Sequence, residues 1–345
     1  MSKTILVTGS AGFIGAHLVL RLLENEEPLR IVGLDNLNGY YDPALKAYRL
    51  RRVEDKAENH PEHEYVFVKG DIADRELVDR LFEENRFDIV VNLAAQAGAR
   101  DSVKHPDAYV ESNVLGFYNI LEACRRYQVK HLVYASSSSV YGGNIRVPFS
   151  TDDKVDEPVS LYAATKRSNE LFASCYSRLY GIPCTGLRFF TVYGPAGRPD
   201  MAYFGFTDKL VRGEKIEIYN YGDCRRDFTY IDDIIEGIYR VMWKAPSVMP
   251  GSDLASHAIY NIGGGQPVNL LDFIQTLQEE LIRAGVLPRD YDFEAHKQLV
   301  PMQPGDVPAT YADTSALERD FGFTPRTPLR EGLRKFAEWY KGYYG

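Results

Sequence analysis

The first half of the chain alternates short apolar runs with longer stretches in which apolar residues recur at helical spacing. The apolar runs are rich in β-branched residues and have the length of buried strands. Repeated strand, helix, strand alternation predicts a doubly wound parallel α/β sheet, with helices on both faces. The expected strands are 4–8, 31–34, 65–68, 88–93 and 131–135, and the expected helices include 107–128 and 160–180.

The second half is less regular and predicts a smaller α/β lobe that is interleaved with the first lobe in sequence. A sixth strand ends near residue 189, and the amphipathic pattern over 232–243 predicts a helix that returns to the first lobe. Further expected elements are helices over 203–211, 269–284 and 329–343, a strand over 259–262 and a polar loop over 246–257. The expected domains are 1–189, with about 230–264 returning to it, and a second lobe of 190–229 and 265–345.

Composition narrows the class of protein without changing this architecture. The chain has 345 residues and a formal net charge of −8, which argues against nucleic acid or an anionic membrane surface as the main partner. A strand pattern begins where a cleavable leader would need an apolar segment, and no window is apolar for long enough to span a bilayer. The seven histidines lack ligand spacing, so we expect no metal. The cysteines form no CxxC pair and are expected to be buried, reduced thiols of a cytoplasmic protein: Cys124, Cys175, Cys184 and Cys224.

A glycine-rich turn directly follows the first expected strand and precedes a helical pattern, the context in which such a turn binds a dinucleotide. Gly9 permits the tight turn, and Gly12 lets the backbone approach a pyrophosphate at the helix N-terminus. Gly15 lets the helix pack closely on the strand. The glycines are spaced three and three, rather than the two and three of the usual dinucleotide motif.

Two acids follow the next strands. Asp35 ends the second strand, twenty residues beyond Gly15, where a carboxylate can accept hydrogen bonds from the adenosine ribose. Because a carboxylate there repels a 2′-phosphate, and residues 36–38 supply no Arg or Lys, NAD is favoured over NADP. Asp71 follows the third strand and fits two roles equally well: contact with the adenine amino group, or capping of the next helix.

The carboxyl ends of the central strands carry small and polar residues, where open α/β sheets bind ligands. Ala94 to Ala97 would let a cofactor pass closely, and Arg100 stands at a mouth that would face an anion. Four consecutive hydroxyls, Ser136 to Ser139, follow the fifth strand. Asn113 lies inside an expected helix, where asparagine is mildly unfavourable, so we expect a buried hydrogen-bonding role for its side chain.

Tyr162 and Lys166 are four residues apart, so in a helix they share one face. A lysine charge beside a phenol favours the phenolate and is expected to lower the tyrosine pKa toward the range of a general acid and base. Taken alone, the pair is weak evidence. The glycine turn and the serine run that precede it make a catalytic role the favoured interpretation.

These motifs together resemble the extended short-chain dehydrogenase/reductase family, whose sheet is of the Rossmann type. The resemblance implies tightly held NAD, Tyr162 as general acid and base, Lys166 on the nicotinamide ribose, and Ser137 bound to the reacting hydroxyl. The cofactor-binding residues that it implies are Gly9, Gly12, Phe13, Ile14, Gly15, Asp35, Asn36, Asp71, Ile72, Leu93, Ala94, Ala95, Gln96, Asn113, Ser136, Tyr162, Lys166 and Tyr193.

Nearly end to end, the sequence is similar to the UDP-glucuronate 4-epimerase group of that family. The similarity lies in residues 35–42, 188–195, 197–202, 222–233 and 303–313, and in Gln303-Pro304, where UDP-galactose epimerases often carry an arginine. It implies UDP-glucuronate and UDP-galacturonate as ligands and a homodimer formed through the helices at about 107–128 and 160–180. The substrate-binding residues that it implies are Arg100, Ser137, Ser138, Ser139, Tyr162, Thr191, Arg198, Arg226 and Asp306.

The identity of two serines bears on the outcome of the implied reaction. Related decarboxylases usually carry Glu at the position of Ser139, and related 4,6-dehydratases carry Asp-Glu at Ser138 and Ser139. Hydroxyls at these positions favour holding a substrate carboxylate without eliminating it. The alternatives are a UDP-glucose/UDP-galactose 4-epimerase, a UDP-glucuronate decarboxylase, a net dehydrogenase and a non-catalytic NAD-binding regulator.

Overall fold

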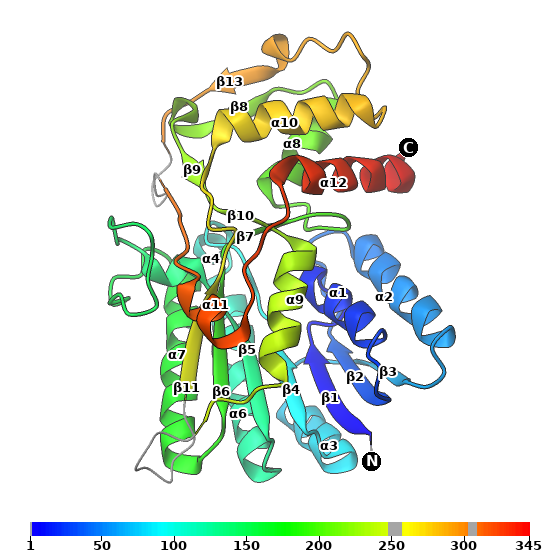
Figure 1. Cartoon of the computed structure of the whole chain (residues 1–345), viewed down its shortest axis with the longest axis vertical. Coiled ribbons are helices and arrows are strands. Elements are labelled where there is room, and N and C mark those ends of the chain that lie inside the picture. The colour runs from blue at the N-terminus through cyan, green and yellow to red at the C-terminus, as the bar shows by residue number, and fades with distance from the viewer. Residues whose placement is uncertain (1, 248–256, 303–308) are drawn as a thin grey trace.

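The structure is a computed structural model that describes residues 2–247, 257–302 and 309–345. Most of the polar loop expected over 246–257 therefore lies outside the described residues, as does Asp306. Figure 1 shows a twisted sheet flanked by helices in the lower part of the molecule and a smaller lobe above it.

The predicted doubly wound parallel sheet is confirmed. Seven parallel strands lie in the order β11-β6-β5-β4-β1-β2-β3, so the chain winds outward in both directions from β1 and β4 (Figure 1). Ligands of such sheets bind at the carboxyl ends of the strands where the winding direction changes. The strands are β1 (Lys3–Thr8), β2 (Leu29–Asp35), β3 (Glu64–Lys69), β4 (Ile89–Asn92), β5 (His131–Ser137), β6 (Cys184–Phe189) and β11 (His257–Ile262).

Helices cover both faces of the sheet, and alternation along the strands decides which side chain meets which layer. Ile5 and Val7 belong to the core beneath α1 (Phe13–Leu22) and α9 (Ile231–Met242). Leu6 belongs to the opposite core. The remaining helices of the sheet layer are α2 (Pro43–Glu58), α3 (Arg75–Asn85), α4 (Asp101–Lys104), α5 (Pro106–Tyr109), α6 (Phe117–Arg126) and α7 (Leu161–Tyr180).

The single helix expected over 107–128 is instead three consecutive pieces. A π-helical stretch, η1 (Val110–Gly116), separates α5 from α6. Wide turns of this kind are frequent at functional sites. Asn113, which is unfavourable in a regular helix, lies inside the stretch and is buried.

The upper lobe contains three helices that the sequence predicts to within one residue at most boundaries: α8 (Ala202–Val211), α10 (Leu270–Arg283) and α12 (Leu329–Tyr344) (Figure 1). The smaller elements are η2 (Ser138–Tyr141), β7 (Thr191–Tyr193), β8 (Ile216–Ile218), η3 (Tyr219–Gly222), β9 (Arg225–Arg226), β10 (Phe228–Tyr230), β12 (Val268–Asn269), η4 (Glu294–His296), β13 (Lys297–Leu299) and α11 (Ser315–Phe321). Short two-stranded pairs accompany the three helices: β10 with β7, β12 with β9 and β13 with β8.

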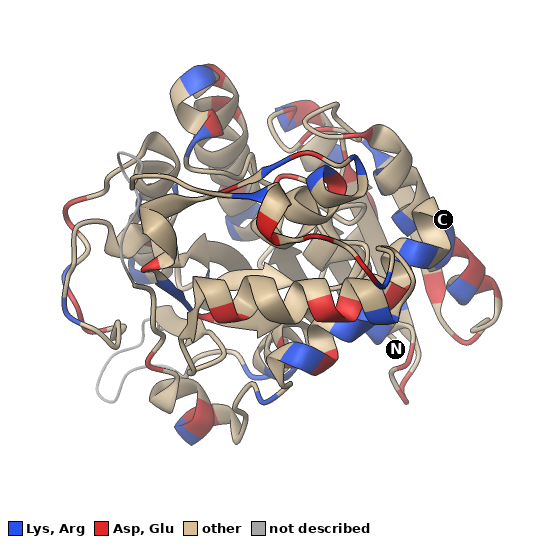
Figure 2. Ribbon diagram, turned by 90° about the horizontal axis from the view of Figure 1, so that it is seen from above, with Lys and Arg blue, Asp and Glu red and all other residues tan. Residues whose placement is uncertain are grey.

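The surface mixes both signs of charge. In Figure 2, acidic and basic residues are interspersed along the outer helices. Within the described ranges, no helix has the length and apolar character needed to cross a bilayer. The four cysteines are free, and Cys175 is exposed, so the expectation that all four are buried is wrong for Cys175: it lies on the outer face of α7.

Candidate functional site

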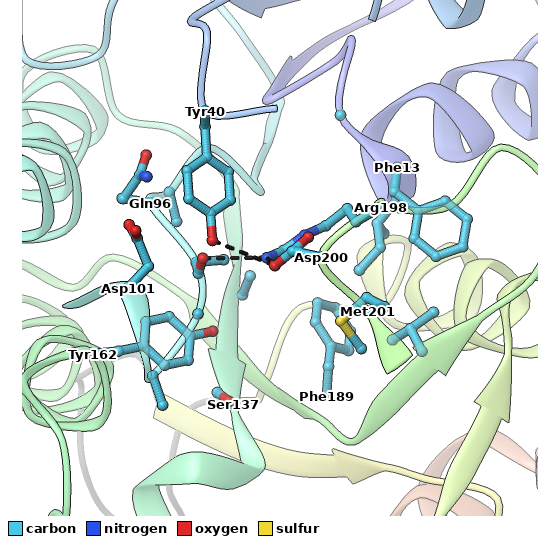
Figure 3. Close-up of a pocket in the computed structure, with 18 of the residues that line it drawn as sticks. Phe13, Tyr40, Gln96, Asp101, Ser137, Tyr162, Phe189, Arg198, Asp200 and Met201 are labelled. Atoms are coloured by element: carbon cyan, nitrogen blue, oxygen red, sulfur yellow. Dashed lines mark hydrogen bonds and ion pairs between the residues drawn. The ribbon is translucent and has the colours of Figure 1, made fainter. Parts of the chain in front are cut away.

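A cavity of about 1080 Å³ lies between the carboxyl ends of the strands and the upper lobe. Its walls come from both halves of the chain, and Figure 3 shows Tyr162 and Ser137 at one side with Arg198 and Asp200 facing them. The predicted site residues that line it are Gly9, Gly12, Phe13, Ile14, Gly15, Asp35, Asn36, Asp71, Ile72, Leu93, Ala94, Ala95, Gln96, Arg100, Ser136, Ser137, Ser138, Ser139, Tyr162, Lys166, Thr191, Arg198 and Arg226.

The glycine turn has the close backbone approaches that a dinucleotide requires. Gly9 has a φ of +68°, a conformation that favours glycine. A Cβ added to Gly15 would lie 2.1 Å from the carbonyl oxygen of Gly9, and one added to Gly12 would lie 2.9 Å from the same atom. Because Gly12 precedes α1 and has no side chain to cap it, the first N–H groups of the helix face a site suited to a diphosphate.

Asp35 closes the end of the cavity that suits an adenosine ribose. Its carboxylate is buried and accepts hydrogen bonds from the backbone N–H groups of Ala11, at 3.1 Å, and Leu37, at 2.8 Å. Each carboxylate oxygen thus accepts one backbone hydrogen bond, which fixes the side chain at the cavity wall. Lys46, which the sequence analysis did not consider, also lines the cavity and donates to Asn38 at 2.7 Å. Burial lowers the pKa of Lys46, and the charge of Asp35 opposes that shift.

The structure excludes helix capping, one of the two roles left open for Asp71, and contact with adenine stays a prediction. Asp74, and not Asp71, caps α3 by accepting from Leu77 at 3.0 Å. Asp71 lines the cavity, accepts from the side-chain amide of Asn36 at 2.7 Å and accepts from the backbone of Ala73 at 2.8 Å. Its carboxylate is therefore held at the cavity wall, where an adenine ring could meet it.

Tyr162 and Lys166 share the inner face of α7, which begins where the side chain of Ser160 accepts from the backbone N–H of Ala163 at 3.1 Å. Lys166 is 3% exposed and donates to the carbonyl oxygen of Ala135 at 3.0 Å. Burial lowers the pKa of Lys166 to about 8. The lysine is therefore a group whose charge is sensitive to its surroundings near neutral pH.

The predicted lowering of the Tyr162 pKa by Lys166 is wrong. Burial raises the pKa of Tyr162, and the opposing contributions come from the hydrogen bond with Ser137 and from the charge of Arg198. The reason is geometric: the Lys166 ammonium donates to a backbone carbonyl, while the phenol is enclosed by the cavity wall. Ser137 and Arg198 thus contribute the stabilisation of the phenolate that the sequence analysis assigned to the lysine.

A buried ion pair supports the catalytic face of α7, and the sequence analysis missed it. The carboxylate of Glu170 accepts from Arg188 at 2.8 and 2.9 Å, and from the hydroxyl of Ser136 at 2.7 Å. Both charged residues are 1% exposed. Glu170 follows Lys166 by four residues, as Lys166 follows Tyr162, and this spacing was the available signal.

The four serines of residues 136–139 make different contacts. Ser136 donates to the buried carboxylate of Glu170, whereas Ser137 accepts from the backbone N–H of Ser139 at 3.1 Å and hydrogen-bonds with Tyr162. Ser138 and Ser139 begin η2 and line the cavity. Ser137 is therefore the serine that contacts the phenol, while Ser138 and Ser139 share its cavity.

Two predicted cofactor residues are absent from the described part of the cavity lining. Asn113 is 1% exposed, and its side-chain amide binds the backbone of Gln96. The amide oxygen accepts from the Gln96 N–H at 2.8 Å, and the amide nitrogen donates to the Gln96 carbonyl oxygen at 2.9 Å. The expected buried hydrogen-bonding role is confirmed, and it acts through Gln96, which does line the cavity. Tyr193 is 1% exposed, lies against Gly332, and hydrogen-bonds the carbonyl of Leu329 at 3.4 Å.

Two cationic residues from the second half of the chain, Arg198 and Arg226, line the same cavity as Tyr162 and Lys166. Arg226 lines the cavity and donates to the carbonyl of Arg225 at 3.0 Å. Arg198 forms an ion pair with Asp200, and the hydroxyl of Tyr40 donates to the same carboxylate at 3.3 Å (Figure 3). No sequence motif predicts the contact between the side chains of Tyr40 and Asp200, because 160 residues separate the two.

A buried arginine joins the glycine turn to the loop that carries Arg198. Arg49, from α2, is 1% exposed. It donates to the carbonyl oxygens of Ala11 at 3.3 Å, Ala196 at 2.8 Å and Gly197 at 2.7 Å. One guanidinium therefore fixes the turn expected to hold a dinucleotide relative to the loop that faces the other ligand.

Comparison with known proteins agrees with this geometry. The family model described as the NAD dependent epimerase/dehydratase family matches residues 5–263. The sequence is 44% identical over 350 residues to UDP-glucuronate 4-epimerase 4 of Arabidopsis thaliana, with 99% of this chain and 76% of that protein covered.

Two solved structures are similar over nearly the whole chain. UDP-glucuronic acid 4-epimerase from Bacillus cereus, in complex with UDP-glucuronic acid and NAD, has a TM-score of 0.83 and 31% identity, covering 98% of this chain and 99% of that chain. UDP-glucose 4-epimerase from Thermotoga maritima, with UDP-glucose, has a TM-score of 0.82 and 29% identity, covering 99% of this chain and 100% of that chain.

Proposed function

Since the chain belongs to the NAD dependent epimerase/dehydratase family, we propose that it interconverts UDP-glucuronate and UDP-galacturonate as an isomerase, with NAD as cofactor and no net redox. One observation carries the proposal: a single cavity joins the glycine turn, the dyad of Tyr162 and Lys166, and the cations Arg198 and Arg226. A dinucleotide and a nucleoside diphosphate sugar can therefore meet at one phenol.

The residues at the glycine turn and around it have the chemistry that NAD binding needs. A Cβ on Gly9, Gly12 or Gly15 would collide with neighbouring backbone, so only glycine allows the tight turn that can hold a diphosphate, and Asp35 offers its carboxylate to a ribose. Lys166 lies where it can hold the second ribose next to Tyr162. When bound, NAD supplies a hydride acceptor and donor at the sugar carbon that changes configuration.

Tyr162 is the group that moves the proton. It takes the proton of the sugar 4-hydroxyl as that carbon is oxidised, and it returns the proton after the flat 4-keto sugar has turned over in the cavity. Ser137, which hydrogen-bonds with Tyr162, holds the reacting oxygen in line with the phenol. The two lobes enclose the ketone and exclude water from it.

A glucuronate substrate imposes an additional demand on the cavity. Its 4-keto form is a β-keto acid, which loses carbon dioxide when the carboxylate bond aligns with the carbonyl π system. Ser137, Ser138, Ser139 and Thr191 all line the cavity and offer hydroxyl donors that can hold the carboxylate out of that alignment. The positions at which related decarboxylases and dehydratases carry acids are serines here.

We also propose that the chain acts as a homodimer in the cytoplasm. Val110 and Leu115 on η1, and Leu171, Leu179 and Tyr180 on α7, expose large apolar side chains. An apolar face of this kind is suited to a second copy of the chain. The division into a cofactor lobe (1–189 with about 230–264) and a UDP-sugar lobe (190–229 and 265–345) is part of the same proposal.

The test is to incubate the purified protein with UDP-glucuronate, without added NAD, and to follow the products by proton NMR. We expect interconversion with UDP-galacturonate and no lasting NADH absorbance. A pentose product would indicate decarboxylation. If added NAD is also without effect, UDP-glucose is the next substrate, because the Thermotoga maritima structure was solved with it. Lasting NADH would identify a net dehydrogenase, and NAD binding without any turnover would identify a regulator.

A further inference from the structure

The loops that follow β2 and β4 lie on opposite sides of the glycine turn. In the parallel sheet, β1 lies between β4 and β2, and the turn directly follows β1. A dinucleotide that binds at the turn therefore lies between the loop after β2 (residues 36–42) and the loop after β4 (residues 93–100). Any contact between these two loops has to cross the carboxyl end of β1.

Tyr40, in the loop after β2, makes such a contact. A Cβ added to Gly98, in the loop after β4, would lie 2.8 Å from the Tyr40 hydroxyl oxygen, so the two loops touch. Gly98 has a φ of +121°, a conformation that favours glycine. The Tyr40 hydroxyl also hydrogen-bonds with the hydroxyl of Tyr109, which donates to the carbonyl oxygen of Gly98 at 2.8 Å. These contacts fix the tip of the Tyr40 side chain on the β4 side of the turn.

The Tyr40 hydroxyl also reaches a third segment of the chain. It donates to the carboxylate of Asp200, in the loop after β7, at 3.3 Å, and Figure 3 shows the Tyr40 side chain directed at that residue. Tyr40, Gly98 and Asp200 all line the cavity that contains the glycine turn. Tyr109 packs edge-on against Tyr162, with ring centroids 6.1 Å apart. The crossing made by Tyr40 therefore lies within the cavity and close to the catalytic tyrosine.

We propose that Tyr40 closes the loops after β2 and β4 over a bound dinucleotide, and thereby retains NAD from one turnover to the next. A reaction without net redox returns NAD to its starting state inside the cavity, so a closed crossing does not limit turnover. The inference rests on the proposed function, since it takes the glycine turn as the NAD site. Tyr40 acts through the two loops and takes no part in moving the proton or the hydride.

The test is the rate of NAD exchange in the wild-type protein and in Tyr40→Ala. Dissociation is measured by loading the protein with radiolabelled NAD and adding an excess of unlabelled NAD. Association is measured by mixing NAD with nucleotide-free protein. A barrier slows entry and exit alike, so its removal should raise both rate constants by at least about tenfold. The dissociation constant of NAD should then change by less than about threefold.

Two further variants isolate the hydroxyl. Tyr40→Phe removes only the hydroxyl contacts and should raise both rate constants by at least about threefold. Its matched control, Tyr260→Phe, removes a hydroxyl bond of 2.9 Å from β11 to Asp320 of α11 and should change neither rate constant. If Tyr40 instead contacts NAD directly, dissociation alone accelerates and NAD binds more weakly by the same factor. That pattern, or unchanged rate constants in either Tyr40 variant, overturns the inference.

Turnover of UDP-glucuronate by the wild-type protein separates the two proposals. Faster NAD entry and exit in the Tyr40 variants, without turnover in the wild type, retains the role of Tyr40 and overturns the proposed substrate. Turnover with unchanged NAD exchange in the variants retains the proposed substrate and overturns the role of Tyr40. If the wild-type protein does not bind NAD, both are overturned.

Discussion

Tyr162 is half-buried in the cavity wall, and the side chains that face its phenol affect how readily it loses a proton. The pKa of the phenol is raised by burial and is opposed by Ser137 and Arg198. The charge of Arg198 is in turn compensated by Asp200. The ease with which Tyr162 gives up its proton is therefore set by side chains from two segments other than its own helix: the end of β5 and the loop of residues 198–200.

The buried pair beneath the dyad makes a prediction about stability. Glu170→Gln leaves the Arg188 guanidinium buried without a charged partner, so we expect the free energy of unfolding to fall by about 3–5 kcal/mol. Urea denaturation measures this change. Asp79→Asn, which removes an ion pair at the surface, should cost less than about 1 kcal/mol. An equal fall in the free energy of unfolding for the two variants would mean that the buried pair contributes no more than a surface pair.

At the level of elements, the turn between β1 and α1 determines whether a dinucleotide can bind. The sequence predicted this turn, and the observed distances explain why glycine is needed there. Gly15→Ala places a Cβ 2.1 Å from the Gly9 carbonyl, so the turn must shift. We expect the purified variant to retain less than about a tenth of the NAD bound by the wild-type protein, measured by chromatography of the denatured samples.

The control for this variant is Gly342→Ala, at a position in α12 where an added Cβ meets no atom within 4 Å. It should keep its full NAD content. If Gly15→Ala keeps its NAD as well, the turn is not the binding site of the diphosphate.

Periodicity and turn residues predicted most elements, because these signals are local. The strands of the sheet and the helices over 203–211 and 329–343 lie within about two residues of their expected places. The π-helical stretch around Asn113 was not predicted, since it depends on hydrogen bonds to Gln96 and Thr165 from other elements. Local pattern gives the type of an element, and tertiary contacts decide where its geometry departs from the regular form.

For the molecule as a whole, the two lobes meet through contacts between residues far apart in sequence. Tyr40 with Asp200, and Arg49 with Gly197, join segments that no sequence motif links. The sequence could therefore identify the dyad, the glycine turn and the serine run, whose residues are close together in the chain. It could not show that Arg198 is paired with Asp200, or that Lys46 approaches Asp35.

Stability of the whole fold should fall in mild acid. His131 is 2% exposed and joins β5 to β6 and α9 through hydrogen bonds with Thr185 and the Met242 carbonyl. Burial lowers its pKa to about 4. Between about pH 6.5 and pH 4, the imidazole is protonated in the unfolded chain and neutral in the folded chain. The free energy of unfolding therefore falls as the pH drops below about 6.5.

For this residue the expected loss between pH 7 and pH 5 is about 2 kcal/mol. Urea denaturation at the two pH values should show a loss smaller by that amount in His131→Asn than in the wild-type protein. The same pH dependence in both proteins would contradict the assignment of a neutral, buried imidazole.

The most direct test of the proposed chemistry uses UDP-glucuronate that carries deuterium at C4, incubated with the wild-type protein and with Tyr162→Phe. If the hydride leaves C4 and returns within one closed cavity, the UDP-galacturonate formed will keep its deuterium at C4. Loss of Tyr162 should slow this conversion by about 10²- to 10⁴-fold. Loss of the label to water, or a product that has lost carbon dioxide, would contradict an epimerisation carried out by this dyad.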